Sequence, residues 1–148
     1  MRLTTLSADS IVISAEVEDW RGAVRTAGSA LANSGSTLPA YGEEMVRMIE
    51  EHGPYVVIAP GLALAHARPG PTVLANGLAV VTLQSPIRFG HPHNDPVSVV
   101  LGLAVADAET HLATVAELAN VFNDESAIPA LAAAQSVDDV LRIMGVTS

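Results

Sequence analysis

The first half of the chain shows both of the hydrophobic periods that define regular secondary structure. A β-branched run at residues 10–14 predicts a strand. Apolar residues then recur every three or four positions in two stretches, which predicts two amphipathic helices. The two stripes are Trp20, Val24, Ala27 and Leu31, and then Tyr41, Met45, Met48 and Ile49. Asp19 is expected to cap the first helix, and Pro39 is expected in the first turn of the second.

The middle of the chain contains three almost continuous apolar runs, at residues 55–59, 77–84 and 97–105. Such runs predict buried strands with both faces of the sheet covered. Asp107 then precedes a helical stripe, and the pattern at residues 136–139 resembles a capping box before a last short helix. The stripe after Asp107 comprises Leu112, Val115, Ala119 and Phe122. The alternation of strands and helices predicts an α/β fold, a single domain over residues 1–148 with helices on both sheet faces.

Composition excludes several classes of function. The chain is 49% hydrophobic but only 3% aromatic, so an aliphatic core is expected. Its formal net charge is −9, which leaves no basic footprint for nucleic acid. The absence of cysteine excludes disulfides, thiolate zinc sites and a cysteine nucleophile. No apolar stretch approaches the roughly 20 residues of a membrane span, and no signal peptide is evident, so we expect a cytoplasmic protein without membrane insertion.

Two histidines occupy positions suited to chemistry. His66 follows an apolar run inside a Gly- and Ala-rich turn, and α/β folds bind ligands at the carboxyl ends of strands. His111 would be the fourth residue of its helix, where free N–H groups and the helix dipole favour an anion. A neutral imidazole is a nucleophile near physiological pH. The alternatives are a surface loop histidine at the first position and a partly exposed polar residue at the second.

Other polar residues give weaker indications. Arg68 could neutralise phosphate charge or be a solvated surface arginine. The cluster of His91, His93 and Asp95 has the residue types of a divalent-metal site, but its spacing is common in loops and no fourth ligand is evident, so neither a metal nor another cofactor is expected. The chain has no glycine-rich nucleotide loop, so any phosphate is expected to arrive already attached to a protein.

The segment at residues 58–69, with His66-Ala67-Arg68-Pro69, resembles the active-site segment of enzyme IIA components of the mannitol–fructose class, from the bacterial phosphoenolpyruvate-dependent sugar phosphotransferase system. Phe89-Gly90 and Asn94-Asp95-Pro96-Val97 follow in the matching order, and the set is most similar to the ascorbate-type branch. One departure is Ala65, since this family usually has a proline before its histidine.

The resemblance implies a mixed sheet sandwiched between helices and a phosphocarrier function. His66 would accept a phosphoryl group from the phosphohistidine of the carrier protein HPr and pass it to a IIB component, usually onto a cysteine. His111 would stabilise the moving phosphoryl charge. Arg68 and Asp95 would support the phosphate site, Asp95 either by orienting that site or by supporting a loop. A regulatory phosphorylation module and a His/Asp metal-binding domain remain as alternatives, and a homodimer is left open.

Overall fold

The computed structural model describes residues 6–145, apart from the side chains of residues 108, 110 and 111. Five strands form one sheet in the order β1-β4-β5-β3-β2. Their bounds are β1 Leu6–Ala15, β2 Val57–Ala59, β3 Leu62–His66, β4 Gly77–Ile87 and β5 Val97–Ala104. Neighbours β1/β4 and β3/β5 are parallel, whereas β4/β5 and β2/β3 are antiparallel. The sheet is therefore mixed, as expected.

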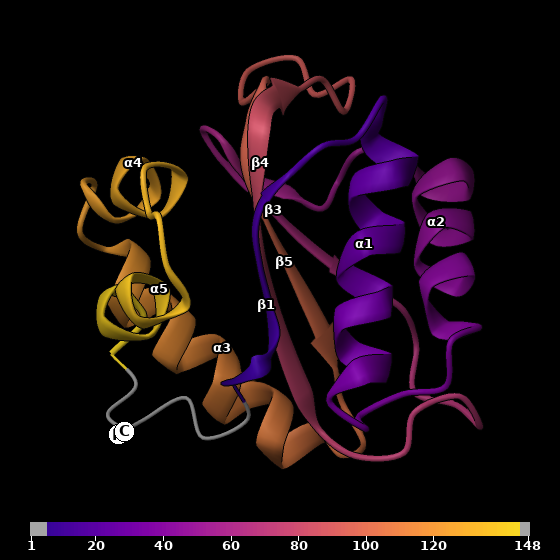
Figure 1. Ribbon diagram of the computed structural model, residues 1–148. Coiled ribbons are helices and arrows are strands. Elements are labelled where there is room, and N and C mark those ends of the chain that lie inside the picture. The colour runs from indigo at the N-terminus through magenta and orange to yellow at the C-terminus, as the bar shows by residue number, and fades with distance from the viewer. Residues whose placement is uncertain (1–5, 146–148) are drawn as a thin grey trace.

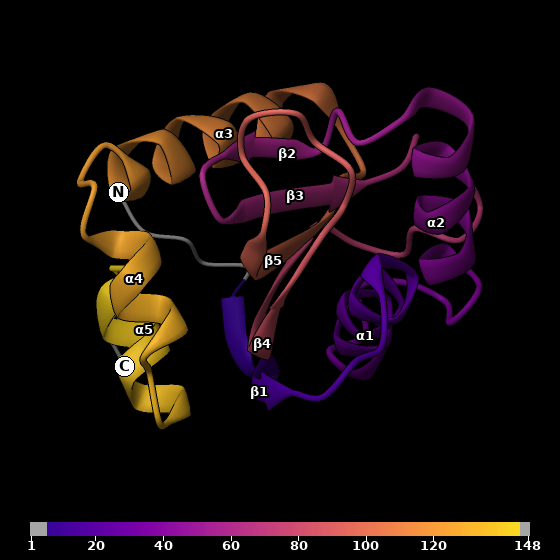
Figure 2. The same ribbon diagram turned by 90° about the horizontal axis from the view of Figure 1, so that it is seen from above.

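Helices cover both faces of this sheet, which confirms the predicted layers. Helices α1 (Trp20–Asn33) and α2 (Tyr41–His52) lie on one face. Helices α3 (Ala108–Phe122), α4 (Ala127–Ala132) and α5 (Val137–Ile143) lie on the other (Figure 1). The view from above shows the sheet between the two groups (Figure 2). Each interface has its own aliphatic core. Among the described residues, no helix has the length and apolar character needed to cross a membrane.

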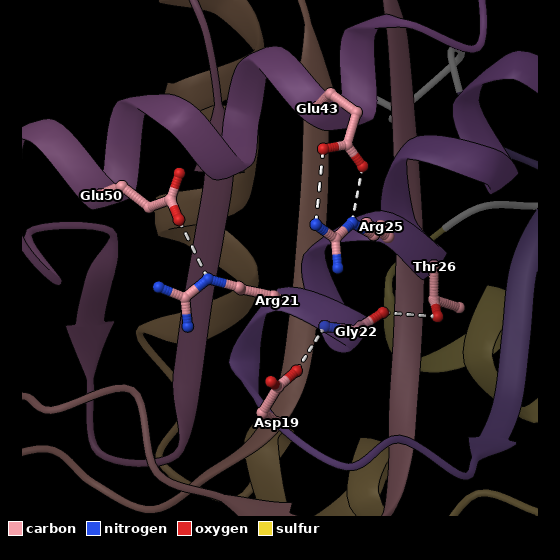
Figure 3. A network of polar contacts seen from close by, with 7 residues as sticks. All are labelled: Asp19, Arg21, Gly22, Arg25, Thr26, Glu43 and Glu50. Carbon is pink, nitrogen blue, oxygen red and sulfur yellow. Dashed lines mark hydrogen bonds and ion pairs between the residues drawn. The ribbon is translucent and has the colours of Figure 1, made fainter.

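The predicted helix caps are largely confirmed. The carboxylate of Asp19 accepts the Gly22 N–H at 2.9 Å (Figure 3), and the hydroxyl of Ser136 accepts the Asp139 N–H at 3.1 Å. Both bonds satisfy N–H groups that a helix start would otherwise leave unpaired. The position of Pro39 was predicted wrongly by a small margin: Ala40 is the N-cap of α2, so the proline precedes the first turn.

Helices α1 and α2 share an apolar core and approach each other closely through their backbones. Figure 3 shows two ion pairs between them, Arg21–Glu50 at 3.0 Å and Arg25–Glu43 at 2.6 Å. All four side chains are solvent-exposed, so each pair contributes little to stability. Gly28 and Gly42 matter more, because a β-carbon at Gly28 would lie 2.5 Å from the Cα atom of Gly42.

Two expectations about the apolar runs are wrong. The run at 55–59 gives only a three-residue edge strand, with Ile58 53% exposed, because Gly61 turns the chain back with φ +83° into a strand that was not predicted, β3. The stripe on α3 is also not a buried face. Leu112 is 71% and Val115 39% exposed, since the face of α3 that is turned to the core carries Thr114, Leu118, Val121 and Phe122.

We predict that Gly28→Ala destabilises the fold. The added methyl group must push α1 away from α2, and overpacking of this kind costs about 1–3 kcal/mol, which exceeds the roughly 1 kcal/mol gained in helix propensity. Ser29→Ala, an exposed change on the same helix, should alter the free energy of unfolding by less than about 0.5 kcal/mol. Denaturant unfolding measures both. A Gly28→Ala variant as stable as the unmodified chain would show that the close contact is not a constraint.

Candidate functional site

A cleft of about 640 Å³ opens where β3 and β5 end. His66 is the last residue of β3 and lies opposite Leu103 of the parallel strand β5. This corrects the expectation that His66 lies in a turn beyond its strand, although the expected strand-end location holds. The residues that line the cleft are Met48, His52, Tyr55, His66, Ala67, Arg68, Pro69, Leu103, Val105 and Asp107. The cleft thus combines apolar walls with two imidazoles, one guanidinium and one carboxylate.

The imidazole of His66 is oriented by its own strand. Its Nδ1 atom lies 3.0 Å from the carbonyl oxygen of Leu64. A carbonyl oxygen can only accept a hydrogen bond, so this contact places the proton of the neutral ring on Nδ1. The lone pair is then on Nε2. The arrangement presents an unprotonated ring nitrogen on a half-buried side chain of the cleft.

Tyr41 fixes the backbone on which His66 is mounted. The tyrosine is fully buried, and its hydroxyl donates to the Leu103 carbonyl at 2.7 Å while accepting the Ala67 N–H at 3.0 Å. Burial raises the pKa of Tyr41, so the hydroxyl keeps its proton at neutral pH and continues to donate. Helix α2, which begins at Tyr41, therefore links the ends of β3 and β5. One indication of this role was visible in the sequence, where Tyr41 is the only aromatic residue of its helical stripe.

Side chains from α2 and from the turn before β2 complete one side of the cleft. Tyr55 is 42% exposed and stands perpendicular to His66, with ring centroids 5.7 Å apart and planes at 90°. It makes a similar contact with His52, at 6.3 Å and 80°. Burial raises the pKa of Tyr55, and the positive charge of Arg68 partly offsets this effect. His52 and Tyr55 were not recognised as site residues from the sequence.

Arg68 also borders a second, more polar hollow of about 440 Å³. Its lining is Glu44, Arg47, Met48, Glu51, His52, Ala67 and Arg68. The α2 members lie three or four positions apart, which is the spacing of one helical face. That spacing was visible in the sequence, but nothing there indicated that this face borders His66. The structure thus places Arg68 beside His66, as expected, and adds a charged rim from α2.

Helix α3 begins shortly after β5 ends, at the same end of the strands as the cleft. His111 is its fourth residue, as predicted, but its side chain lies outside the described part of the chain. Asp107 lines the cleft, and Asn76 holds the segment before the helix: its amide donates to Asp107 at 3.4 Å and accepts the Ala106 N–H at 2.7 Å. The start of α3 is therefore fixed to the loop that precedes β4.

Asp95 lies at the other end of these strands. Its carboxylate accepts three backbone N–H groups of its own loop, those of Phe89 at 3.0 Å, Gly90 at 2.7 Å and His91 at 3.1 Å. The same loop meets the start of β3, where the Gly61 N–H donates to the Asn94 carbonyl at 3.0 Å. Of the two roles expected for Asp95, orienting the phosphate site or supporting a loop, these contacts fit the support of a loop.

His91, from the cluster that resembles a metal site, also supports the structure of this loop. The Nδ1 atom of His91 accepts the N–H groups of His93 at 3.1 Å and Asn94 at 3.0 Å. Together with Asp95, these contacts shape the loop between β4 and β5. Among the described side chains, no group of three or more His, Asp or Glu residues is arranged to hold a metal ion.

Comparison with known proteins adds the family context. Residues 4–145 match the family described as "Phosphoenolpyruvate-dependent sugar phosphotransferase system, EIIA 2". The chain is 37% identical over 140 residues to the ascorbate-specific PTS system EIIA component of Shigella boydii, covering 94% of this chain and 91% of that protein. It also resembles the crystal structure of IIA mannitol from Escherichia coli, with a TM-score of 0.81 and 28% identity over 94% of this chain and 98% of that one.

A further similar structure is a complex of enzyme IIA mannitol with phosphorylated enzyme IIB mannitol from Escherichia coli. The TM-score is 0.83 at 27% identity, over 95% of this chain and 96% of that chain. These structures confirm the expected fold of the mannitol–fructose class. They share the complete architecture described above rather than one part of it.

We predict that Tyr41→Phe lowers the free energy of unfolding by about 1–3 kcal/mol, because the buried carbonyl of Leu103 and the N–H of Ala67 lose their partner. The Ala67 amide should also exchange its hydrogen faster. Tyr55→Phe is the matched control, since it removes the hydroxyl of a half-exposed tyrosine and should leave stability almost unchanged. Denaturant unfolding and amide exchange measure these effects. Unchanged values for Tyr41→Phe would mean that the hydroxyl does not clamp the strands.

Proposed function

The chain belongs to the EIIA type 2 family of the phosphoenolpyruvate-dependent sugar phosphotransferase system, and on that premise we propose that it carries a phosphoryl group on Nε2 of His66. The observation that supports this most is the 3.0 Å contact between Nδ1 and the Leu64 carbonyl. A nitrogen nucleophile needs a lone pair, and this contact assigns the lone pair to Nε2. The position of the histidine in the cleft supports the same assignment.

The proposed reaction has two half-steps. In the first, the Nε2 lone pair attacks the phosphorus atom of the phosphohistidine of HPr. The old N–P bond breaks, and its electron pair returns to the HPr imidazole. In the second, a cysteine thiolate of a IIB component attacks the same phosphorus atom, and the electron pair returns to Nε2. The proton on Nδ1 stays in place throughout, so neither half-step requires His66 to exchange a proton with water.

The surroundings of His66 suit a transfer that depends on positioning and charge. Little covalent chemistry falls to the protein in phosphoryl transfer, so fixed geometry and nearby positive charge matter most. Tyr41 supplies the fixed geometry through the ends of β3 and β5. Arg68, at the cleft, is proposed to offset phosphate charge. His111, in the first turns of α3, is proposed to donate a hydrogen bond to the phosphoryl oxygens.

The proposed partners follow from the relatives. Those named ascorbate-specific EIIA components support a role in ascorbate uptake, and the mannitol complex supports a IIB component as phosphoryl acceptor. The exposed apolar side chains Leu112 and Val115 on α3, and Ile58 on β2, are proposed as contacts for such a partner. A regulatory module would also accept phosphate on His66, but it would not pass it to a IIB component. Transfer to IIB therefore separates the two functions.

We predict that His66→Ala abolishes phosphorylation. Incubation with phosphoenolpyruvate, enzyme I and HPr should add the mass of one phosphoryl group to the unmodified chain and none to the variant. His93→Ala, an exposed histidine in the loop at the far end of the strands, should be modified normally. The modification should be labile in acid and stable in alkali, as expected for a phosphoramidate. Full modification of His66→Ala would refute the assignment.

We predict that His111→Ala still forms the phosphoprotein but slows transfer by about a hundredfold, the usual effect of removing one donor to a developing charge. Asn120→Ala, an exposed change on the same helix, is the control and should leave the rates unaltered. Rapid-mixing measurements with phosphorylated HPr and with a IIB component give the rate of each half-step. If both rates are normal in the His111 variant, this histidine has no part in the reaction.

A further inference from the structure

Tyr55 occupies a position that the stability of the fold does not explain. The residue lies in the turn before β2, and 42% of it is exposed to solvent. Its ring nevertheless contacts two rings of the cleft at right angles or nearly so, that of His66 at 5.7 Å and that of His52 at 6.3 Å. Perpendicular arrangements at these distances are attractive contacts between ring systems. Tyr55 is therefore packed against the proposed nucleophile rather than into the core.

The contact with Tyr55 matters because the orientation of the His66 ring is otherwise weakly restrained. Among the side chains and backbone groups that the structure describes, one hydrogen bond holds the imidazole, from Nδ1 to the Leu64 carbonyl. A half-turn of the ring about its bond to Cβ would bring a ring carbon to that carbonyl and break the hydrogen bond. Neither ring nitrogen would then be favoured for the proton, so the lone pair would no longer be assigned to Nε2. One neutral hydrogen bond is too weak to exclude this state fully.

We propose that Tyr55 is a positioning residue for His66. Its ring occupies the space beside the imidazole and keeps Nδ1 on the Leu64 carbonyl, so that Nε2 stays unprotonated. The role belongs to the aromatic ring and not to the hydroxyl, because the contact is defined by the two ring planes. This inference rests on the proposed function of His66. The orientation of the imidazole can nevertheless be measured on the isolated chain, without any partner.

The first measurement is the protonation pattern of His66 in the full chain. Nitrogen NMR of the imidazoles distinguishes the Nδ1–H from the Nε2–H tautomer. We expect His66 to be mainly in the Nδ1–H form in the unmodified chain and in Tyr55→Phe, which keeps the ring. In Tyr55→Ala the Nδ1–H fraction should fall. Leu74→Ala is the control, because Leu74 is 57% exposed and does not line the cleft.

The second measurement is the single-turnover rate of phosphoryl transfer from phosphorylated HPr. Tyr55→Ala should lower the maximal rate about two- to tenfold, which is the size expected for one lost ring contact. The HPr concentration that gives half the maximal rate should not change. Tyr55→Phe and Leu74→Ala should keep the maximal rate of the unmodified chain. Thermal unfolding of all three variants shows whether each is folded.

Three results would overturn the proposal. An unchanged tautomer fraction in Tyr55→Ala would show that the ring does not orient His66. A loss in Tyr55→Phe as large as in Tyr55→Ala would assign the role to the hydroxyl. A change only in the half-saturating HPr concentration would make Tyr55 a docking contact. If the unmodified chain accepts no phosphate, the proposed function fails, but the NMR comparison still decides whether Tyr55 orients the ring.

Discussion

The hydroxyl of Tyr41 is the contact on which the geometry of the cleft depends. The β3/β5 ladder pairs residues up to His66 and Leu103, and the Tyr41 hydroxyl extends this link, since the Ala67 N–H and the Leu103 carbonyl both bond to it. A buried hydroxyl with both roles filled is stable, whereas the same groups left unpaired would be costly. His66 immediately precedes Ala67, so its backbone is held by this clamp. The orientation of its imidazole then follows from the neighbouring carbonyl of Leu64.

Tyr41 can reach the strand ends because α2 packs closely on α1, and α1 in turn packs on the sheet. Small residues allow this approach. Gly28 and Gly42 let the two helices touch, and Gly102 on β5 would bring an added β-carbon to 3.2 Å from the Cβ atom of Ala27. The abundance of alanine and glycine in an almost non-aromatic chain is thus a requirement of the packing. The loop anchored by Asp95 acts at the far end, where it meets the turn before β3.

Local patterns predicted much of the fold, because helix stripes and caps depend on residues close in sequence. The caps at Asp19 and Ser136 and the strands at residues 77–84 and 97–105 are examples. What depends on pairing between distant segments was missed. Strand β3 was taken for a turn, since its alanines resemble a flexible stretch and it becomes a strand through its ladders with β5 and β2. The end of the sheet at which Asp95 lies, and the face of α3 that packs on the core, also depend on contacts between distant segments.

The central proposal is that the phosphoryl group resides on Nε2 of His66 while Nδ1 keeps its hydrogen bond to Leu64. Nitrogen and phosphorus NMR of the chain phosphorylated by HPr tests this most directly, because coupling between the two nuclei identifies the bonded nitrogen. We expect the coupling at Nε2, with a proton retained on Nδ1. Coupling at Nδ1 would contradict the proposal, since it would require the hydrogen bond that orients the ring to be broken.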